Sequence, residues 1–330
     1  MRALILLAVG AALTYAPIAH AAAPAAPAAR VKADVAPHVL FPNGETVARW
    51  IYAYRTKPDP EKLPAAVKAM SQHGLFKDSE ASGLYLGFIA GVLSTTPDTA
   101  EALVARMFPL PPEDHIAVIK AIAYSGLPRW KQILSSVAER MPARASVVDR
   151  YLTGKLPTLA DLPLDSGPAP LDLLWGTYYA TGSYEPVLRI VSILDWSKRA
   201  DNVDRLTIGS MAKWTLAQNA SRDMDLLQAL KRAQTHEPKA TAGILKEVIE
   251  AADIGEVAKI RKDALASIET MKIKGSEKLQ NHNWWGQAGQ TALALGCVTA
   301  SVLGQAAIGI PCVIGGALSG VAIKALAPKE

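Results

Sequence analysis

The sequence of 330 residues has only two cysteines, few aromatic residues and no recognisable catalytic signature. It lacks Gly-x-Ser-x-Gly, His-Glu-x-x-His and Cys-x-x-Cys elements and a phosphate-binding loop. Its six histidines never pair at the spacing of metal ligands. The absence of these motifs excludes the enzyme classes that they identify. We therefore assign no catalytic residue, no cofactor and no metal ligand from the sequence.

Two groups of acidic residues come closest to a site. Residues 113–115 (Glu-Asp-His) stand together, but acids in the first turn of a helix are explained by the helix dipole. Asp161, Asp165 and Asp172 surround an irregular stretch, yet they lack the regular oxygen spacing of a calcium loop. We expect both groups to have structural roles.

Residues 1–21 have the pattern of a cleavable secretion signal. Arg2 supplies a positive charge, Ala3–Leu13 an uncharged apolar segment, and Ala19-His20-Ala21 a small-x-small cleavage site. The apolar segment is shorter than the ~20 residues of a membrane span, and the lack of a nearby cysteine excludes lipid anchoring there. We expect a periplasmic or secreted protein in which an Ala/Pro-rich tether, residues 22–42, precedes the fold.

Residues 43–235 show helical signals and no strand-like alternation of any length. Thr96-Pro97-Asp98 offers a capping hydroxyl, an early proline and an early acid, which together predict a helix start. Turns at Thr181-Gly182-Ser183 and Ala220-Ser221 predict two helical hairpins, and Asn43 predicts a cap. Because each helix must bury one apolar stripe, we predict an all-α fold, an irregular α-solenoid-like array of short helical hairpins.

Two segments of this array look familiar. Leu171–Gly182 (LDLLWGTYYATG) and Met211–Ala220 (MAKWTLAQNA) resemble segments of uncharacterised exported helical proteins from Gram-negative bacteria. The resemblance implies a helical fold and an envelope location, and it carries over no functional residues. Within the chain, Leu84–Gly91 is also loosely similar to Leu174–Gly182, which we attribute to shared helix-packing chemistry rather than to a repeat.

Residues 236–278 predict a long amphipathic helix. Apolar residues recur at three- and four-residue steps from Ile254, while several lysines lie off that face, and Gly255 weakens the start. The positions of the stripe are Ile254, Val257, Arg261, Ala264, Leu265, Ile268 and Met271. The helix either packs on the array or binds a membrane interface or a partner.

Residues 279–330 are rich in Gly and Ala, and no Asp, Glu, Lys or Arg occurs from Leu279 to Ile323. We predict an apolar helical hairpin with arms at Gln287–Leu303 and Pro311–Leu326. Its small residues form stripes of the kind that let helix backbones approach closely. These stripes include Gly289, Gly296, Gly304, Gly316 and Gly320.

The surroundings of this C-terminal hairpin are open to three alternatives. It is buried or self-packed in a soluble protein, inserted in a membrane, or engaged with another copy of the chain. Each arm is short, and Ala and Gly contribute little to membrane insertion. The sequence therefore does not require the arms to span a membrane. Trp284 and Trp285 precede the hairpin and suit a water–lipid boundary, although they equally suit packing on the array.

Cys297 and Cys312 both lie in this hairpin, and in an oxidising envelope they predict a disulfide. A turn near Gly304-Gln305 would place them at the same height. A bridge needs Cα atoms about 5.5 Å apart, closer than the 8–10 Å of ordinary helix pairs. If the turn lies at Gly309-Ile310 instead, the pair is out of register and two free thiols result.

The net charge and the predicted export together limit the classes of partner that this chain can have. A formal net charge of +5 over the whole chain is too small for a nucleic-acid binder, and export argues against nucleic acid independently. We predict a non-enzymatic envelope scaffold or binding protein, with the C-terminal hairpin anchoring it to a membrane or a protein partner. The alternatives are a membrane-active protein that forms pores or assists translocation, and an enzyme with an unrecognised site.

Overall fold

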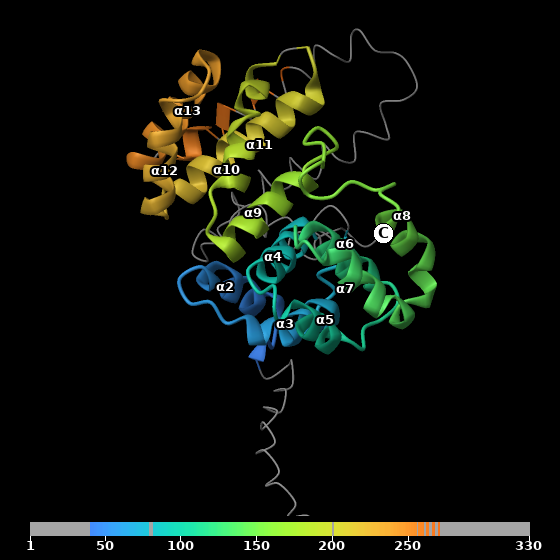
Figure 1. Cartoon of the computed structure of the whole chain (residues 1–330). Coiled ribbons are helices and arrows are strands. Elements are labelled where there is room, and N and C mark those ends of the chain that lie inside the picture. The colour runs from blue at the N-terminus through green and yellow to red at the C-terminus, as the bar shows by residue number, and fades with distance from the viewer. Residues whose placement is uncertain are drawn as a thin grey trace, which may run out of the picture. The chain divides into compact units, whose positions relative to one another are not determined.

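The computed structural model describes residues 40–78, 82–199, 201–255, 257–260, 262–263, 266–267 and 270. Every regular element in these residues is a helix, and the elements are joined by turns and loops (Figure 1). The predicted all-α fold is therefore confirmed. The solenoid-like stacking is not confirmed, because the most extensive contact joins α4 (Gly83–Ser94) to α9 (Ala169–Thr181), with four other α-helices between them in the chain.

The described helices before residue 153 are short, and local signals mark some of their boundaries. The Asn43 side chain accepts a hydrogen bond from the Thr46 N–H (3.0 Å) and so caps α2 (Gly44–Tyr54), as predicted. Besides α2 and α4, these elements are η1 (Pro60–Lys62), α3 (Leu63–Gln72), α5 (Ala100–Met107), α6 (His115–Tyr124), α7 (Trp130–Val137), η2 (Ala138–Arg140), η3 (Pro142–Arg144) and α8 (Ala145–Leu152).

The helices after residue 168 include both predicted hairpins. α9 and α10 (Glu185–Val191) flank Gly182, whose φ of +69° is the left-handed conformation that ends many helices. η4 (Leu194–Lys198) follows. α11 (Val203–Ala220) and α12 (Met224–Gln234) form the second hairpin, and α13 (Lys239–Asp253) packs on both.

The prediction that Thr96 caps α5 is wrong. Its hydroxyl instead donates to the carbonyl of Val92 (2.9 Å) in the last turn of α4. α5 begins at Ala100, after Thr99, which makes no side-chain capping bond. The last carbonyls of a helix lack partners inside the helix, so a threonine just beyond α4 serves that end rather than the next start.

Glycines bring the backbones of α4 and α9 into contact. A Cβ on Gly87 would overlap the carbonyl oxygen of Leu173, and a Cβ on Gly176 would overlap that of Leu84. The Thr177 hydroxyl shares its proton between the Leu173 carbonyl of its own helix (2.9 Å) and the Gly87 carbonyl of α4 (3.3 Å), and the second contact requires such a close approach. The two segments whose sequences are loosely alike are thus packing partners (Figure 1).

Two arginines hold the irregular segment between α8 and α9. Arg189 donates to the carbonyls of Leu159 (2.6 Å) and Leu162 (3.1 Å), and Arg205 pairs with Asp165 (3.0 Å). These contacts attach the loop to α10 and α11. The segment is therefore attached to the helical core and does not separate the core into two parts.

The amphipathic stripe predicted from Ile254 differs at its start. α13 ends at Asp253, and Gly255 adopts a left-handed φ of +72°. Ile254 is 67% exposed, whereas Val257 and Ile260 are buried. The glycine reverses the backbone twist, so Ile254 does not share a face with the residues that follow. The later stripe positions are outside the side chains that the structure describes.

No helix among the described residues is long and apolar enough to cross a membrane. The predicted secretion signal (1–21), nearly all of the tether (22–42) and the C-terminal hairpin (279–330) lie outside these residues. The same applies to the glycine stripes, to Trp284 and Trp285, and to the Cys297–Cys312 disulfide. These remain predictions from the sequence.

We predict that Gly87→Ala destabilises the protein by at least ~2 kcal/mol, because a backbone atom of α9 blocks the new methyl group. The matched control is Gly243→Ala in α13, where a Cβ would meet nothing within 4 Å. That change should stabilise the protein by about 0.5–1 kcal/mol through helix propensity. Urea unfolding of both variants measures the two effects. Equal effects would contradict the close-contact explanation.

Candidate functional site

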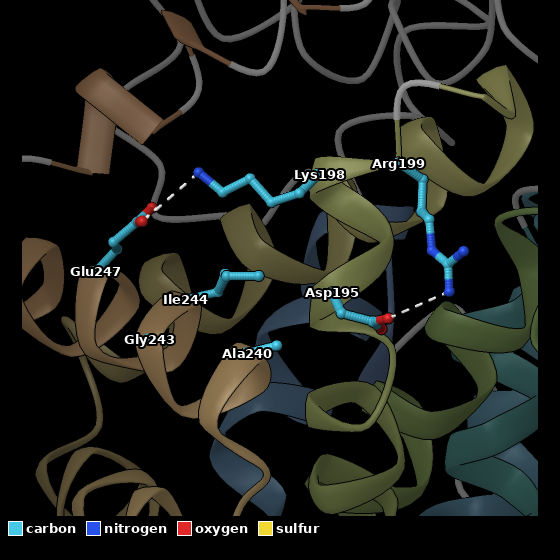
Figure 2. A pocket seen from close by; sticks show the side chains of 7 residues that line it. All are labelled: Asp195, Lys198, Arg199, Ala240, Gly243, Ile244 and Glu247. Atoms are coloured by element: carbon cyan, nitrogen blue, oxygen red, sulfur yellow. Dashed lines mark ion pairs between the residues drawn. The ribbon is translucent and has the colours of Figure 1, made fainter.

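A hollow of about 510 Å³ opens between η4 and α13. Its apolar side consists of Ala240, Gly243 and Ile244 from α13, and its remaining lining is charged (Figure 2). The charged residues are Asp195, Lys198, Arg199 and Glu247. We call this site the η4–α13 hollow and treat it as the candidate binding site.

Ion pairs connect the walls of the hollow. Lys198 of η4 reaches across to Glu247 of α13 at 3.5 Å, while Arg199 pairs with Asp195 at 3.7 Å on the η4 side (Figure 2). Lys213 of α11 is also hydrogen-bonded to Glu247. The Lys198 side chain is 61% exposed and that of Lys213 only 13%. Glu247 thus has one buried cationic partner and one exposed partner.

The charge of Glu247 is fixed by these neighbours. Partial burial opposes ionisation of its carboxyl group, but the hydrogen bonds and positive charges of Lys213 and Lys198 outweigh burial and lower its pKa below the usual 4.5. The carboxylate therefore stays ionised at neutral pH. It can accept hydrogen bonds and attract cations, but it has no proton to donate.

α11 positions both walls of the hollow. A Cβ on Gly209 would overlap the backbone of Ser197 and Trp196, so this glycine lets η4 lie directly on α11. The Arg205 guanidinium stacks over the Trp196 ring, 5.1 Å from its centre. α13 packs against α11 as well. The spacing between the walls is therefore set by contacts with one helix.

A second polar group, the Asp223 cluster, joins α2, α9 and α12. It consists of Asp223, Arg55 and Tyr178. The Asp223 carboxylate accepts hydrogen bonds from Arg55 and from the Tyr178 hydroxyl (2.7 Å), and the guanidinium also lies 5.3 Å from the Tyr178 ring centre. Its other oxygen accepts from the Leu226 N–H (3.1 Å) and caps α12. The cluster is largely buried and fully engaged, which indicates a structural role.

Electrostatics in the Asp223 cluster favour the ionised carboxylate. Burial alone would raise the pKa of Asp223, but hydrogen bonds from Tyr178 and Leu226 and the charge of Arg55 lower it below the usual 3.8. Burial and the neighbouring carboxylate together raise the pKa of Tyr178 far above the usual 10. Tyr178 therefore remains a hydrogen-bond donor at neutral pH.

The acidic groups singled out from the sequence do not come together. Asp114 accepts a hydrogen bond from Ser71 (2.6 Å), and Nε2 of the buried His115 donates to the Leu110 carbonyl (3.0 Å). Asp161 accepts from the neighbouring Thr158, Asp165 pairs with Arg205, and Asp172 is buried in α9. Within the described part of the chain, no group of three His, Cys, Asp or Glu side chains could hold a metal ion.

Sequence reasoning missed the hollow entirely. Its lining comes from residues 195–199 and from α13, with Lys213 of α11 behind Glu247. Each segment on its own shows only ordinary surface charge. One local signal was available: Gly209, in the middle of a predicted helix, indicated a close backbone approach.

The chain matches no protein-family model, no curated protein and no solved structure. The resemblance to exported helical proteins accordingly stays a prediction from the sequence. The function is therefore inferred from the geometry of the chain itself.

We predict that Asp223→Asn lowers the stability of folding at pH 7 by about 1–3 kcal/mol, because asparagine keeps the cap but loses the ion pair. The folded-state pKa of Asp223 is depressed, so its contribution is present above pH ~4 and disappears as the pH falls through that lowered pKa. Urea unfolding at pH 7, 5 and 3 should show the difference from wild type shrinking toward acid.

The control for this prediction is Asp225→Asn. The Asp225 side chain is 80% exposed and lies 3.8 Å from Arg55, so its loss should change stability by no more than ~0.5 kcal/mol. A constant effect of Asp223→Asn at every pH would show that the ion pair is not the cause.

Proposed function

We propose that this chain is an exported binding or scaffold protein of the bacterial envelope, and that it binds a partner in the η4–α13 hollow. The observation that carries the proposal is the construction of the hollow. Both walls pack on α11, one of them through the direct contact at Gly209, so the spacing is set before a ligand arrives. A preformed site avoids part of the ordering cost of binding.

The chemistry of the hollow supports binding rather than catalysis. Its charged side chains pair with one another, and Lys198, Arg199 and Glu247 are each about half exposed or more. General acid–base catalysis requires a group whose pKa lies near the working pH. The pKa of Glu247 is shifted away from neutrality. These groups are suited to recognising charge on a partner.

The location and the anchor rest on the ends of the sequence. The pattern of residues 1–21 supports export, and the uncharged segment within residues 279–330 supports attachment to a membrane or to a protein partner. A second copy of the chain is one such partner. In this proposal the helical array is the recognition part and the C-terminal segment holds it in place.

A photoreactive residue at position 243 should crosslink the partner in cells. Gly243 lines the hollow, and a Cβ there would meet nothing within 4 Å, so the probe can leave the backbone toward open space. We expect one reproducible adduct, identified by mass spectrometry. The control is the same probe at exposed Gln132 on α7, far from the hollow in sequence and outside its lining. The absence of any adduct specific to position 243 would contradict the proposal.

Deleting residues 287–330 should shift the protein from the membrane fraction to the soluble fraction, provided that this segment anchors it to lipid. Cell fractionation followed by immunoblotting measures the distribution. A variant with unchanged length, in which Gly316 and Gly320 are replaced by leucine, tests whether the small stripe is needed. If the full chain and the truncated chain are equally soluble, the lipid anchor is excluded.

A further inference from the structure

The arrangement of charges points to a specific class of ligand. We infer that the η4–α13 hollow binds a polypeptide segment in which an acidic side chain is flanked by aliphatic ones, with the acid paired to Lys198. This inference rests on the proposed function and adds the chemistry of the partner. It follows from the charges, the exposure and the apolar side of the hollow.

The charged residues that line the hollow balance, because Lys198 and Arg199 face two acids, Asp195 and Glu247, so 2 − 2 leaves no net charge. Lys213, which lies outside the lining and pairs with Glu247, adds one positive charge to this ion-pair network. Arg199 balances Asp195, and Lys213 holds Glu247 from its buried side. A ligand that takes Lys198 therefore leaves no carboxylate of the hollow without a partner. An anionic group fits there, whereas a cation would meet Lys198 unfavourably.

Lys198 can also leave its present partner at small cost, and it is the most exposed of the three cations. Its contact with Glu247 is 3.5 Å long, beyond a normal charge-assisted hydrogen bond, and its side chain is 61% exposed. Exposed ion pairs contribute only ~0–1 kcal/mol. A ligand carboxylate can thus replace Glu247 as its partner at small loss. In the present arrangement Lys198 bridges the walls above Ile244 (Figure 2).

The openness of the hollow favours a polypeptide over a small molecule. Sites for small molecules enclose most of the ligand surface, but the charged side chains that line this hollow are 35–61% exposed. An extended or helical segment can lie across such a site and still bury its contacting side chains. Ala240 and Gly243 are exposed next to Lys198, with the buried Ile244 beside them, and this small apolar side of the hollow is the reason for placing aliphatic residues beside the acid.

The test uses the purified chain without its signal and a fluorescein-labelled peptide, Gly-Ser-Leu-Glu-Leu-Glu-Leu-Ser-Gly. Fluorescence anisotropy should show binding that weakens with added salt and falls when Gln or Lys replaces Glu in the peptide. Lys198→Ala should weaken binding of the Glu peptide about five-fold, the upper range for an exposed pair. The matched control is Lys246→Ala, which removes an exposed lysine of α13 that pairs with Glu250 and should have no effect.

The outcomes separate this inference from the proposed function. A specific crosslink at position 243 with no preference for the Glu peptide keeps the binding site and overturns the acidic ligand. Equal effects of Lys198→Ala and Lys246→Ala overturn it as well. Binding of dodecanoate, measured by calorimetry, together with no binding of any peptide would assign the carboxylate to a lipid and overturn the polypeptide. Loss of the crosslink itself overturns the proposed function.

Discussion

Direct contact between the backbones of α4 and α9 is the constraint on which the rest of the structure depends. Helices that pack through ordinary side chains lie 8–10 Å apart, but Gly87 and Gly176 leave no room for a Cβ between these two. Close packing of this kind maximises dispersion contacts and permits the Thr177–Gly87 hydrogen bond. Because α4 belongs to the first half of the chain and α9 to the second, this contact unites them in one core.

A glycine contact of the same kind, on a smaller scale, positions one wall of the candidate site. Gly209 allows η4 to lie on α11, and the helix then also receives α13. Gly243 has the opposite surroundings, since a side chain there would enter open space. Gly209 therefore fixes the position of the η4 wall, and Gly243 leaves the α13 wall free of a side chain. The Asp223 cluster ties α12, which α13 packs against, to α2 and α9.

The local elements were predictable from the sequence, and the long-range contacts were not. Asn43 and Gly182 mark helix ends through chemistry that acts within a few residues, so the pattern was sufficient. Thr96 has two helix ends within reach, and sequence alone did not say which of them it serves. The glycines of α4 and α9 indicated close packing, but their pairing depends on the whole fold. Lys198, Lys213 and Glu247 meet only through tertiary structure.

The proposed binding role of the hollow depends on the unequal partners of Glu247. Lys213 is almost buried and keeps the carboxylate charged, whereas Lys198 is exposed and adds little to stability. Two equally buried lysines would hold the acid rigidly and leave nothing for a ligand to replace. With no lysine behind it, Glu247 would be left unpaired whenever a ligand drew Lys198 away. In the proposed function, this division between a fixed cation and a replaceable one would let the surface bind a charged ligand without destabilising its own fold.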